Sequence, residues 1–228
     1  MNTLPTDNDP VQAWMALGVQ SAILARTMPA VRHDRAGPLS AMRMAATVLK
    51  RRLGTGELPP AQAVERVEQF EGHLTRLADS AKRLRHWDLP AQDSAQPLAA
   101  VAAQAAQLAR PLLAMRGTDL QAPGPLPETP VAAHTTLCLL LGALYHLAET
   151  GSPPPARITV QAVQGRSGLR VQADGQADAG LAAFASQPVP PLDAAALLCL
   201  ARHGGAHVQC GAGWVELDAA PARPDVTP

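Results

Sequence analysis

The first 88 residues place the strongest constraint on the fold, because their apolar side chains follow a helical spacing while the other faces are charged. Over residues 9 to about 53 the apolar positions recur three and four apart. The segment GTGELPP, residues 54–60, predicts a turn, and a second helix is expected over residues 60 to about 87. Pro29 and Pro38 interrupt the first helix, so we expect kinks, or a break near Pro29.

This helical hairpin cannot bury its apolar surface alone. On the second helix a coiled-coil-like seam is formed by Val64, Val67, Phe70 or Glu71, Leu74, Leu77 or Ala78, Ala81 and Leu84. Pairing two copies into a four-helix bundle covers the surface that one hairpin leaves open. The sequence therefore predicts a homodimer built on a hairpin domain over residues 9–88, preceded by a disordered stretch over residues 1–8.

A second domain is expected after a Pro- and Ser-containing linker at residues 89–97, LPAQDSAQP. It covers residues 98–218, and the tail 219–228 is expected to be disordered. The apolar patterns predict helices near residues 98–115, 131–148 and 192–202 and strands near residues 156–163, 168–174, 207–210 and 213–217. The predicted fold class is α+β, with a dimeric helical-hairpin domain followed by a small α/β sandwich.

Charge and cysteine content indicate which partners and which cellular compartment to expect. Nineteen Lys and Arg balance nineteen Asp and Glu, which argues against nucleic acid or an anionic membrane as a partner. Three cysteines make an odd set and no dense disulfide framework. The N-terminus lacks a basic leader, and no apolar run approaches the roughly 18 residues that cross a bilayer. We expect a cytoplasmic protein with no membrane partner.

The stretch VRHDRAGPL, residues 31–39, is the most informative for chemistry. His33 is followed by Asp34, and a proline interrupts the helix at Pro38. An imidazole exposed on a bundle face is a nucleophile near neutral pH, and a neighbouring carboxylate orients it or accepts its proton. The alternative is that His33 is only a solvated polar residue.

HDRAGPL resembles the phosphoacceptor box of two-component sensor histidine kinases, in which a His is followed by an acid and, at the fifth position, Pro-Leu. The resemblance continues from about residue 19 to residue 217. Residues 97–121 look like the opening helix and first strand of the kinase ATP-binding domain, residues 135–151 lie where its N-box helix belongs, and residues 197–217 look like its closing helix and hairpin. The second domain is therefore expected to resemble a histidine-kinase catalytic domain.

Departures from the kinase pattern fall on the nucleotide contacts. The two N-box Asn positions that serve metal and nucleotide are Gly142 and His146, so magnesium would lose its usual amide ligand. In VQADGQADAG, residues 171–180, Ala173 stands at the adenine-binding Asp position. Asp174, which is followed by Gly175, takes the place of that Asp only if the alignment is shifted by one residue.

The segment that leads into the last long helix also departs from the pattern. Residues 180–192 are too short for a normal lid, and Pro188, Pro190 and Pro191 lack the N–H donors that bind phosphate. The resemblance therefore implies a degenerate site that binds no ATP and no other cofactor.

An intact His beside a domain without ATP motifs is similar to bacterial histidine phosphotransferases of the ChpT type and to the sporulation phosphotransferase of bacilli. The resemblance implies transfer of a phosphoryl group between response-regulator receiver domains through His33, oriented by Asp34, with Mg²⁺ supplied by the receiver. A hybrid histidine kinase is a further candidate partner. The residues expected to meet a receiver are Arg32, Arg35, Pro38 and Arg43.

Two alternatives for the function stay open. One is an ATP-dependent sensor-type histidine kinase with a divergent nucleotide site, and the other is a non-catalytic adaptor that binds a receiver or a kinase. Phosphatase activity is not expected, because Gly37 stands where such kinases place a Thr or Asn.

A possible zinc set offers nitrogen and sulfur ligands in Cys199, His203, His207 and Cys210. Strand alternation along HVQC separates His207 from Cys210, so the ligands should diverge and no metal site is expected.

Overall fold

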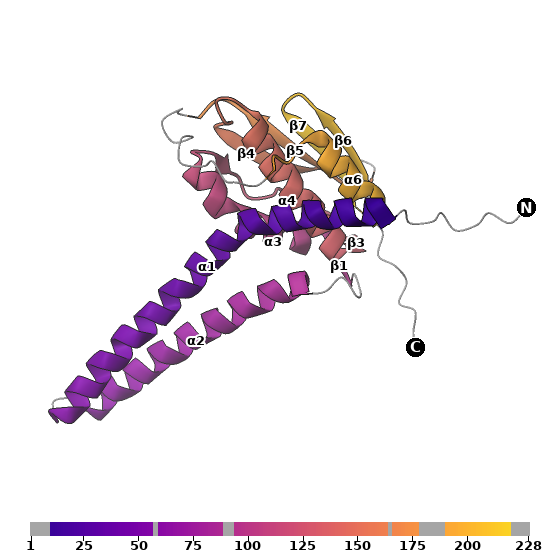
Figure 1. Ribbon diagram of the computed structural model, residues 1–228. Helices are drawn as coiled ribbons and strands as arrows, with labels where there is room; N and C mark the ends of the chain where they lie inside the picture. The colour runs from indigo at the N-terminus through magenta and orange to yellow at the C-terminus, as the bar shows by residue number, and fades with distance from the viewer. Residues whose placement is uncertain (1–9, 57–58, 89–93, 164–165, 178–189, 220–228) are drawn as a thin grey trace, which may run out of the picture. The chain divides into compact units, whose positions relative to one another are not determined.

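The structure is a computed structural model, and it describes residues 10–56, 59–88, 94–163, 166–177 and 190–219 (Figure 1). The chain divides into two compact units. Unit 1 comprises Met1–Thr27 together with Ala91–Pro228, and unit 2 comprises Met28–Pro90. The fold is α+β, as predicted, and each unit is described below by itself.

Unit 2 is a helical hairpin. Helix α1 spans Pro10–Gly54, of which residues from Met28 onward belong to this unit, and α2 spans Pro60–Asp88. The expected break near Pro29 is absent, because α1 is one helix of 45 residues that contains both prolines. A proline removes one backbone donor, and the flanking turns keep their own hydrogen bonds.

The burial pattern on α2 separates two apolar stripes. Between residues 61 and 79, the side chains that are not exposed recur three and four positions apart at Ala63, Arg66, Phe70, His73 and Leu77. Three members of the predicted seam, Val64, Val67 and Leu74, lie on the neighbouring stripe and are 59%, 49% and 53% exposed. The non-exposed stripe therefore includes Phe70 and Leu77 of the predicted seam, whereas Val64, Val67 and Leu74 lie one position away from it. A second apolar stripe stays open on the same helix.

Unit 1 is built on a five-stranded sheet in the order β2-β4-β5-β7-β6 (Figure 1). Its strands are β2 (Asp119–Leu120), β4 (Arg157–Val163), β5 (Gly168–Asp174), β6 (His207–Gly211) and β7 (Trp214–Asp218). The β2–β4 pair is parallel and the others are antiparallel. A short separate pair joins β1 (Ala95–Pro97) to β3 (Pro130–Ala132). Strand β1 therefore lies at the end of the segment 89–97 that the sequence predicts to be a linker.

Three helices complete this unit: α3 (Leu98–Met115), α4 (Ala133–Thr150) and α6 (Ala194–Gly204). Helix α4 is buried along almost its whole length, because it packs against α3, α6, β5 and β7. Its leucines, from Leu137 to Leu147, therefore form the core. Of the described helices, α3 alone is long and apolar enough to cross a membrane, and half of it is buried in the unit.

The first turns of α1, residues 10–27, belong to unit 1 and not to the hairpin domain to which the sequence analysis assigned residues 9–88. Ile23 is completely buried. Arg26 donates two hydrogen bonds to the Glu149 carboxylate, at 2.6 and 2.7 Å, and a third to the carbonyl of Pro190 at 2.8 Å. The hydroxyls of Thr27 and Tyr145 lie 3.0 Å apart. These contacts bind α1 to α4 and to the segment before α6.

The ion pair between Arg26 and Glu149 predicts a large loss of stability in Arg26→Ala. The two side chains are 3% and 10% exposed, so the truncation leaves a buried carboxylate whose other partner among the described residues is Arg116, at 3.5 Å. We expect the free energy of unfolding to fall by about 3 kcal/mol. Urea denaturation followed by circular dichroism measures this change.

Arg43→Ala is the matched control, because Arg43 is exposed on the same helix. Its free energy of unfolding should change by no more than about 0.5 kcal/mol. Equal stability of the two variants would contradict the role assigned to the buried pair.

Candidate functional site

The candidate phosphoacceptor stretch lies entirely within α1. Residues 33 and 34 are helical, and the side chains of His33 and Asp34 fall outside the described part of the structure. Positions 37, 40 and 44 follow position 33 at one, two and three helical turns, so they mark the same face of α1. Their residues, Gly37, Ser40 and Met44, are all exposed. This face of α1 is therefore open on the two to three turns after position 33.

The four residues expected to meet a receiver divide into two pairs. Arg32 and Arg43 are exposed and lie three helical turns apart on one face. Arg35 and Pro38 are only partly exposed, on a stripe that also contains the buried Met42. The Nε atom of Arg35 is buried without a hydrogen-bond partner. Arg32 and Arg43 thus offer free charge to a partner, whereas Arg35 is drawn toward the hairpin interior.

Gly142 lies on α4 where the kinase pattern has its first Asn, and the space beside it is filled. A Cβ atom built on Gly142 would lie 2.7 Å from Cδ2 of Leu197 and 3.3 Å from Cδ1 of Ile23. Leu197 comes from α6 and Ile23 from the first turns of α1, and both are fully buried. Residues of the chain itself therefore occupy the position that an Asn side chain would need.

His146, at the second Asn position, is also buried in the protein interior. Its ring is 9% exposed, and Nδ1 lies 2.7 Å from the carbonyl oxygen of Leu192. Because a carbonyl only accepts, His146 must carry a proton on Nδ1 and donate it. The ring ties α4 to the segment that enters α6.

The end of β5 and the residue after it hold Ala173, Asp174 and Gly175, which the resemblance aligns with nucleotide contacts of a kinase. Ala173 is held in the sheet, and its N–H donates to the carbonyl of Gly213 at 2.8 Å. Asp174 is exposed, and its carboxylate accepts from the N–H of Gly175 at 2.8 Å. Gly175 has a φ of 66°, which favours glycine at this turn. Asp174 thus serves its own turn, while Gly142 faces the side chains of Leu197 and Ile23 and His146 is bonded to the Leu192 carbonyl.

The sequence analysis missed the residues that hold α1 on α4, namely Arg26, Thr27, Tyr145 and Glu149. Burial raises the pKa of Tyr145 far above its usual value, so its hydroxyl stays neutral and hydrogen-bonded to Thr27. The sequence does contain a signal for this pair. Arg26 lies on the apolar first helix and Glu149 near the end of the most apolar helix, and a charged side chain buried there needs a partner. The spacing of residues along the sequence does not show that these two, which lie 123 positions apart, form a pair.

The possible zinc set does not come together. The burial of β6 alternates, with His207 exposed and Val208 buried, and α6 ends at Gly205 in a left-handed conformation with φ of 67°. Across the residues that the structure describes, no group of three or more His, Cys, Asp or Glu is placed to hold a metal ion. Burial raises the pKa of the Cys210 thiol, which disfavours the thiolate that zinc requires.

Comparison with known proteins finds likenesses among solved structures. No protein-family model matches the chain, and no curated protein matches its sequence. A solved structure described as a bacterial phosphotransferase aligns over 95% of this chain and 97% of its own, with 12% identity and a TM-score of 0.40. At this TM-score and identity the likeness carries no argument about activity.

The filled space beside Gly142 predicts that restoring the kinase residue is harmful. In Gly142→Asn the new side chain must displace Leu197 and Ile23, so we expect a loss of about 1–3 kcal/mol in the free energy of unfolding. Gly72→Asn is the matched control, because a Cβ at Gly72 meets nothing within 4 Å. If urea denaturation gave equal stability for the two variants, the close packing of α1 and α6 on α4 would be refuted.

Proposed function

We propose that the chain is a histidine phosphotransferase of a two-component phosphorelay. It accepts a phosphoryl group from the aspartate of one receiver domain on His33 and passes it to the aspartate of another. We place it in the bacterial cytoplasm and propose response-regulator receivers and a hybrid histidine kinase as partners. The unit with kinase-like element order then contributes no nucleotide chemistry.

One observation carries this proposal. The two α4 positions that serve metal and nucleotide in kinases are a glycine packed against Leu197 and Ile23 and a histidine bonded to the Leu192 carbonyl. A phosphoryl donor other than ATP is therefore favoured. The stretch HDRAGPL nevertheless remains in a helical hairpin, on a helix whose face is exposed at Gly37, Ser40 and Met44.

The transfer step balances without a nucleotide. The imidazole nitrogen of His33 attacks the phosphorus of the receiver's aspartyl phosphate, an N–P bond forms, and the bond from phosphorus to the carboxylate oxygen breaks. Asp34 orients the imidazole or takes its proton. Mg²⁺ bound by the receiver neutralises the phosphoryl oxygens, so this chain needs only to position its histidine. The return step reverses these bonds on the second receiver.

Charge on the exposed face of α1 suits this partner. Arg32 and Arg43 are exposed, and we assign them to the acidic rim that surrounds a receiver's phosphorylated aspartate. Arg35 and Pro38 act indirectly in this proposal, by shaping the hairpin beneath the docking face.

The test of the proposal follows phosphoryl transfer from a radiolabelled receiver in nucleotide-free buffer. Wild type should gain acid-labile label, and His33→Ala should lose it completely because the accepting nitrogen is gone. His207→Ala, which removes an exposed histidine on β6, should label like wild type.

Three results would oppose the relay. Equal labelling of His33→Ala would exclude His33 as the acceptor. Label from Mg-ATP alone would indicate a kinase, and absence of label with several receivers that bind the chain would indicate an adaptor.

Dimerisation is the second part of the proposal. The open stripe on α2 contains Val64, Val67 and Leu74, and α1 also exposes the apolar side chains Leu39, Val48 and Leu53, which are 49%, 39% and 58% exposed. Exposed apolar side chains on both arms, at helical spacing on α2, support burial against a second copy in a four-helix bundle.

The dimer predicts that Val67→Lys yields a monomer, because two lysines would enter the apolar centre of the bundle. Light scattering after size-exclusion chromatography measures the mass at micromolar concentration. Glu68→Lys, at the adjacent exposed position, should leave the dimer intact. A dimeric Val67→Lys protein would refute this interface.

A further inference from the structure

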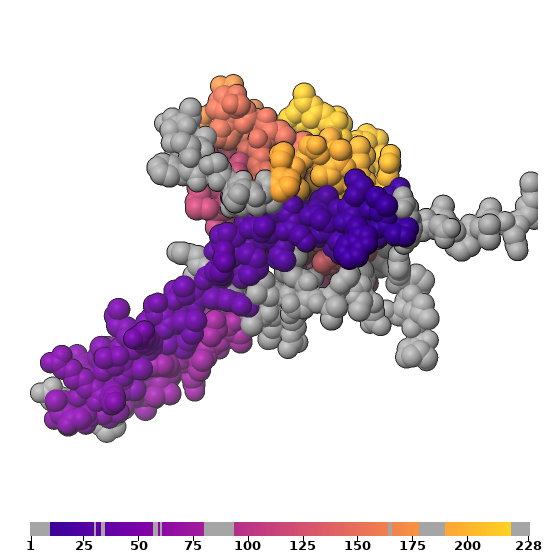
Figure 2. Space-filling model, viewed as in Figure 1, coloured from indigo at the N-terminus to yellow at the C-terminus, as the bar shows by residue number. Residues whose placement is uncertain are grey.

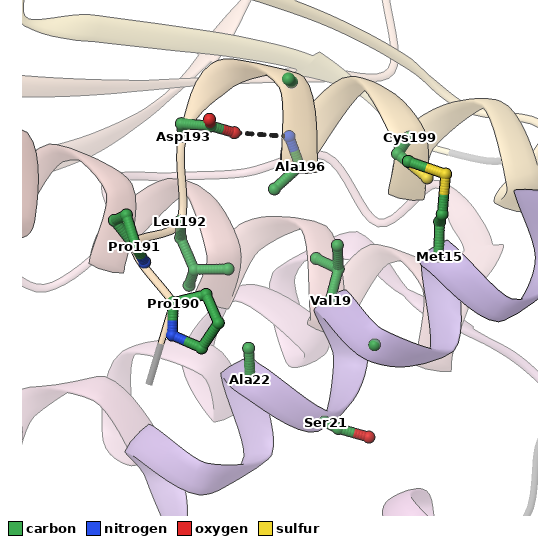
Figure 3. Close-up of a pocket in the computed structure, with 12 residues that line it drawn as sticks. Met15, Val19, Ser21, Ala22, Pro190, Pro191, Leu192, Asp193, Ala196 and Cys199 are labelled. Atoms are coloured by element: carbon green, nitrogen blue, oxygen red, sulfur yellow. Dashed lines mark hydrogen bonds between the residues drawn. The ribbon is translucent and has the colours of Figure 1, made fainter. Parts of the chain in front are cut away.

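A groove with a volume of about 580 Å³ lies within unit 1, between the first turns of α1 and the segment that enters α6 (Figure 3). Met15, Val19 and Ala22 line it from α1, and Pro190, Pro191 and Cys199 line it from the other side. Figure 2 shows these turns of α1, in indigo, directly against the gold surface of α6. None of these residues belongs to the phosphotransfer site proposed above.

The walls of the groove are held in place by the protein itself. Arg26 donates to the Pro190 carbonyl at 2.8 Å and so joins α1 to the opposite wall. Asp193 caps α6 by accepting from the N–H of Ala196 at 2.8 Å (Figure 3). Leu192, which lines the groove, is only 1% exposed, so it is anchored in the core. The groove is therefore formed before any ligand arrives.

The backbone carbonyls of residues 190, 192 and 193 in the wall are already engaged. The carbonyl of Pro190 accepts from Arg26, that of Leu192 from His146, and that of Asp193 from the N–H of Leu197 at 3.2 Å. Pro190 and Pro191 have no N–H to offer. Apart from the side chains of Ser21, Asp193 and Cys199, the lining is hydrocarbon, so a ligand gains little there by carrying many hydrogen-bonding groups.

Small residues explain why the space is open. Gly18 and Ala22 on α1 face Ala195 and Ala196 on α6, so neither helix fills the gap between them. Close-packed interiors rarely leave voids of this size, whereas small-molecule sites of about 300–1,000 Å³ are common. The volume matches that of a ligand site.

We propose that this groove binds an uncharged, largely apolar small molecule. A phosphorylated or otherwise anionic ligand is disfavoured, because the charged group on the lining is the carboxylate of Asp193. The proposal does not depend on phosphotransfer through His33, and either can fail alone.

The test uses the full chain and N-phenyl-1-naphthylamine, a neutral apolar dye whose fluorescence rises on burial. Gly18 lines the groove, and a Cβ there meets nothing within 4 Å, so Gly18→Leu fills the space without a clash. Gly72→Leu is the matched control, since Gly72 lies on α2 and is equally unhindered. Circular dichroism checks that both variants keep their helices.

Wild type and Gly72→Leu should bind the dye saturably at one site per chain, and Gly18→Leu should bind at least tenfold more weakly. Absence of saturable binding to wild type would overturn the proposal, because the groove would then be closed or already filled. Equal binding by all three proteins would also overturn it, because the dye would then sit on the exposed stripes of the hairpin.

Cysteine alkylation gives a second readout that places the dye. Cys199 lines the groove, whereas Cys210 lies on β6. Saturating dye should slow the alkylation of Cys199 severalfold and leave that of Cys210 unchanged, as measured by mass spectrometry of peptides. Unchanged alkylation of Cys199 would show that the dye binds elsewhere.

Discussion

The buried ion pair between Arg26 and Glu149 is the interaction on which unit 1 depends. It joins residues 123 positions apart, and the same guanidinium also reaches the carbonyl of Pro190. Removing two charges from water is costly, and good geometry together with extra hydrogen bonds offsets that cost. Arg26 bonds both the Glu149 carboxylate on α4 and the Pro190 carbonyl before α6, so the first turns of α1 become part of this unit. Ile23 on these turns is buried in its core.

This docking has a chemical consequence. On α4, the positions that the resemblance aligns with the two Asn residues of a kinase are Gly142 and His146, and the space beside them is taken by Ile23, Leu197 and the Leu192 carbonyl. In the proposed function, these residues fill the place where a kinase binds its nucleotide. The proposed division of labour follows: α1 and α2 present a histidine and form a dimer, while unit 1 supports them without ATP.

Much of the fold was predictable because its signals are local. Periods of 3.6 and 2 residues located the helices that the structure describes and the main strands. Contacts between distant segments were not predictable. On α2 the non-exposed stripe includes the predicted Phe70 and Leu77, whereas Val64 and Val67 lie one position away from it, because spacing does not say which of two adjacent apolar stripes lies inside. The positions 142 and 146 were identified from the resemblance, but their burial against Ile23 and Leu192 was not.

Calorimetric titration of Mg-ATP into the purified chain tests the central claim most directly, namely that the nucleotide position is filled by the chain's own residues. The account predicts no saturable heat up to millimolar nucleotide, with wild type and Gly142→Asn alike. Saturable binding of one Mg-ATP per chain would contradict it, because Ile23 and Leu197 would then have to leave the face of α4 that they cover.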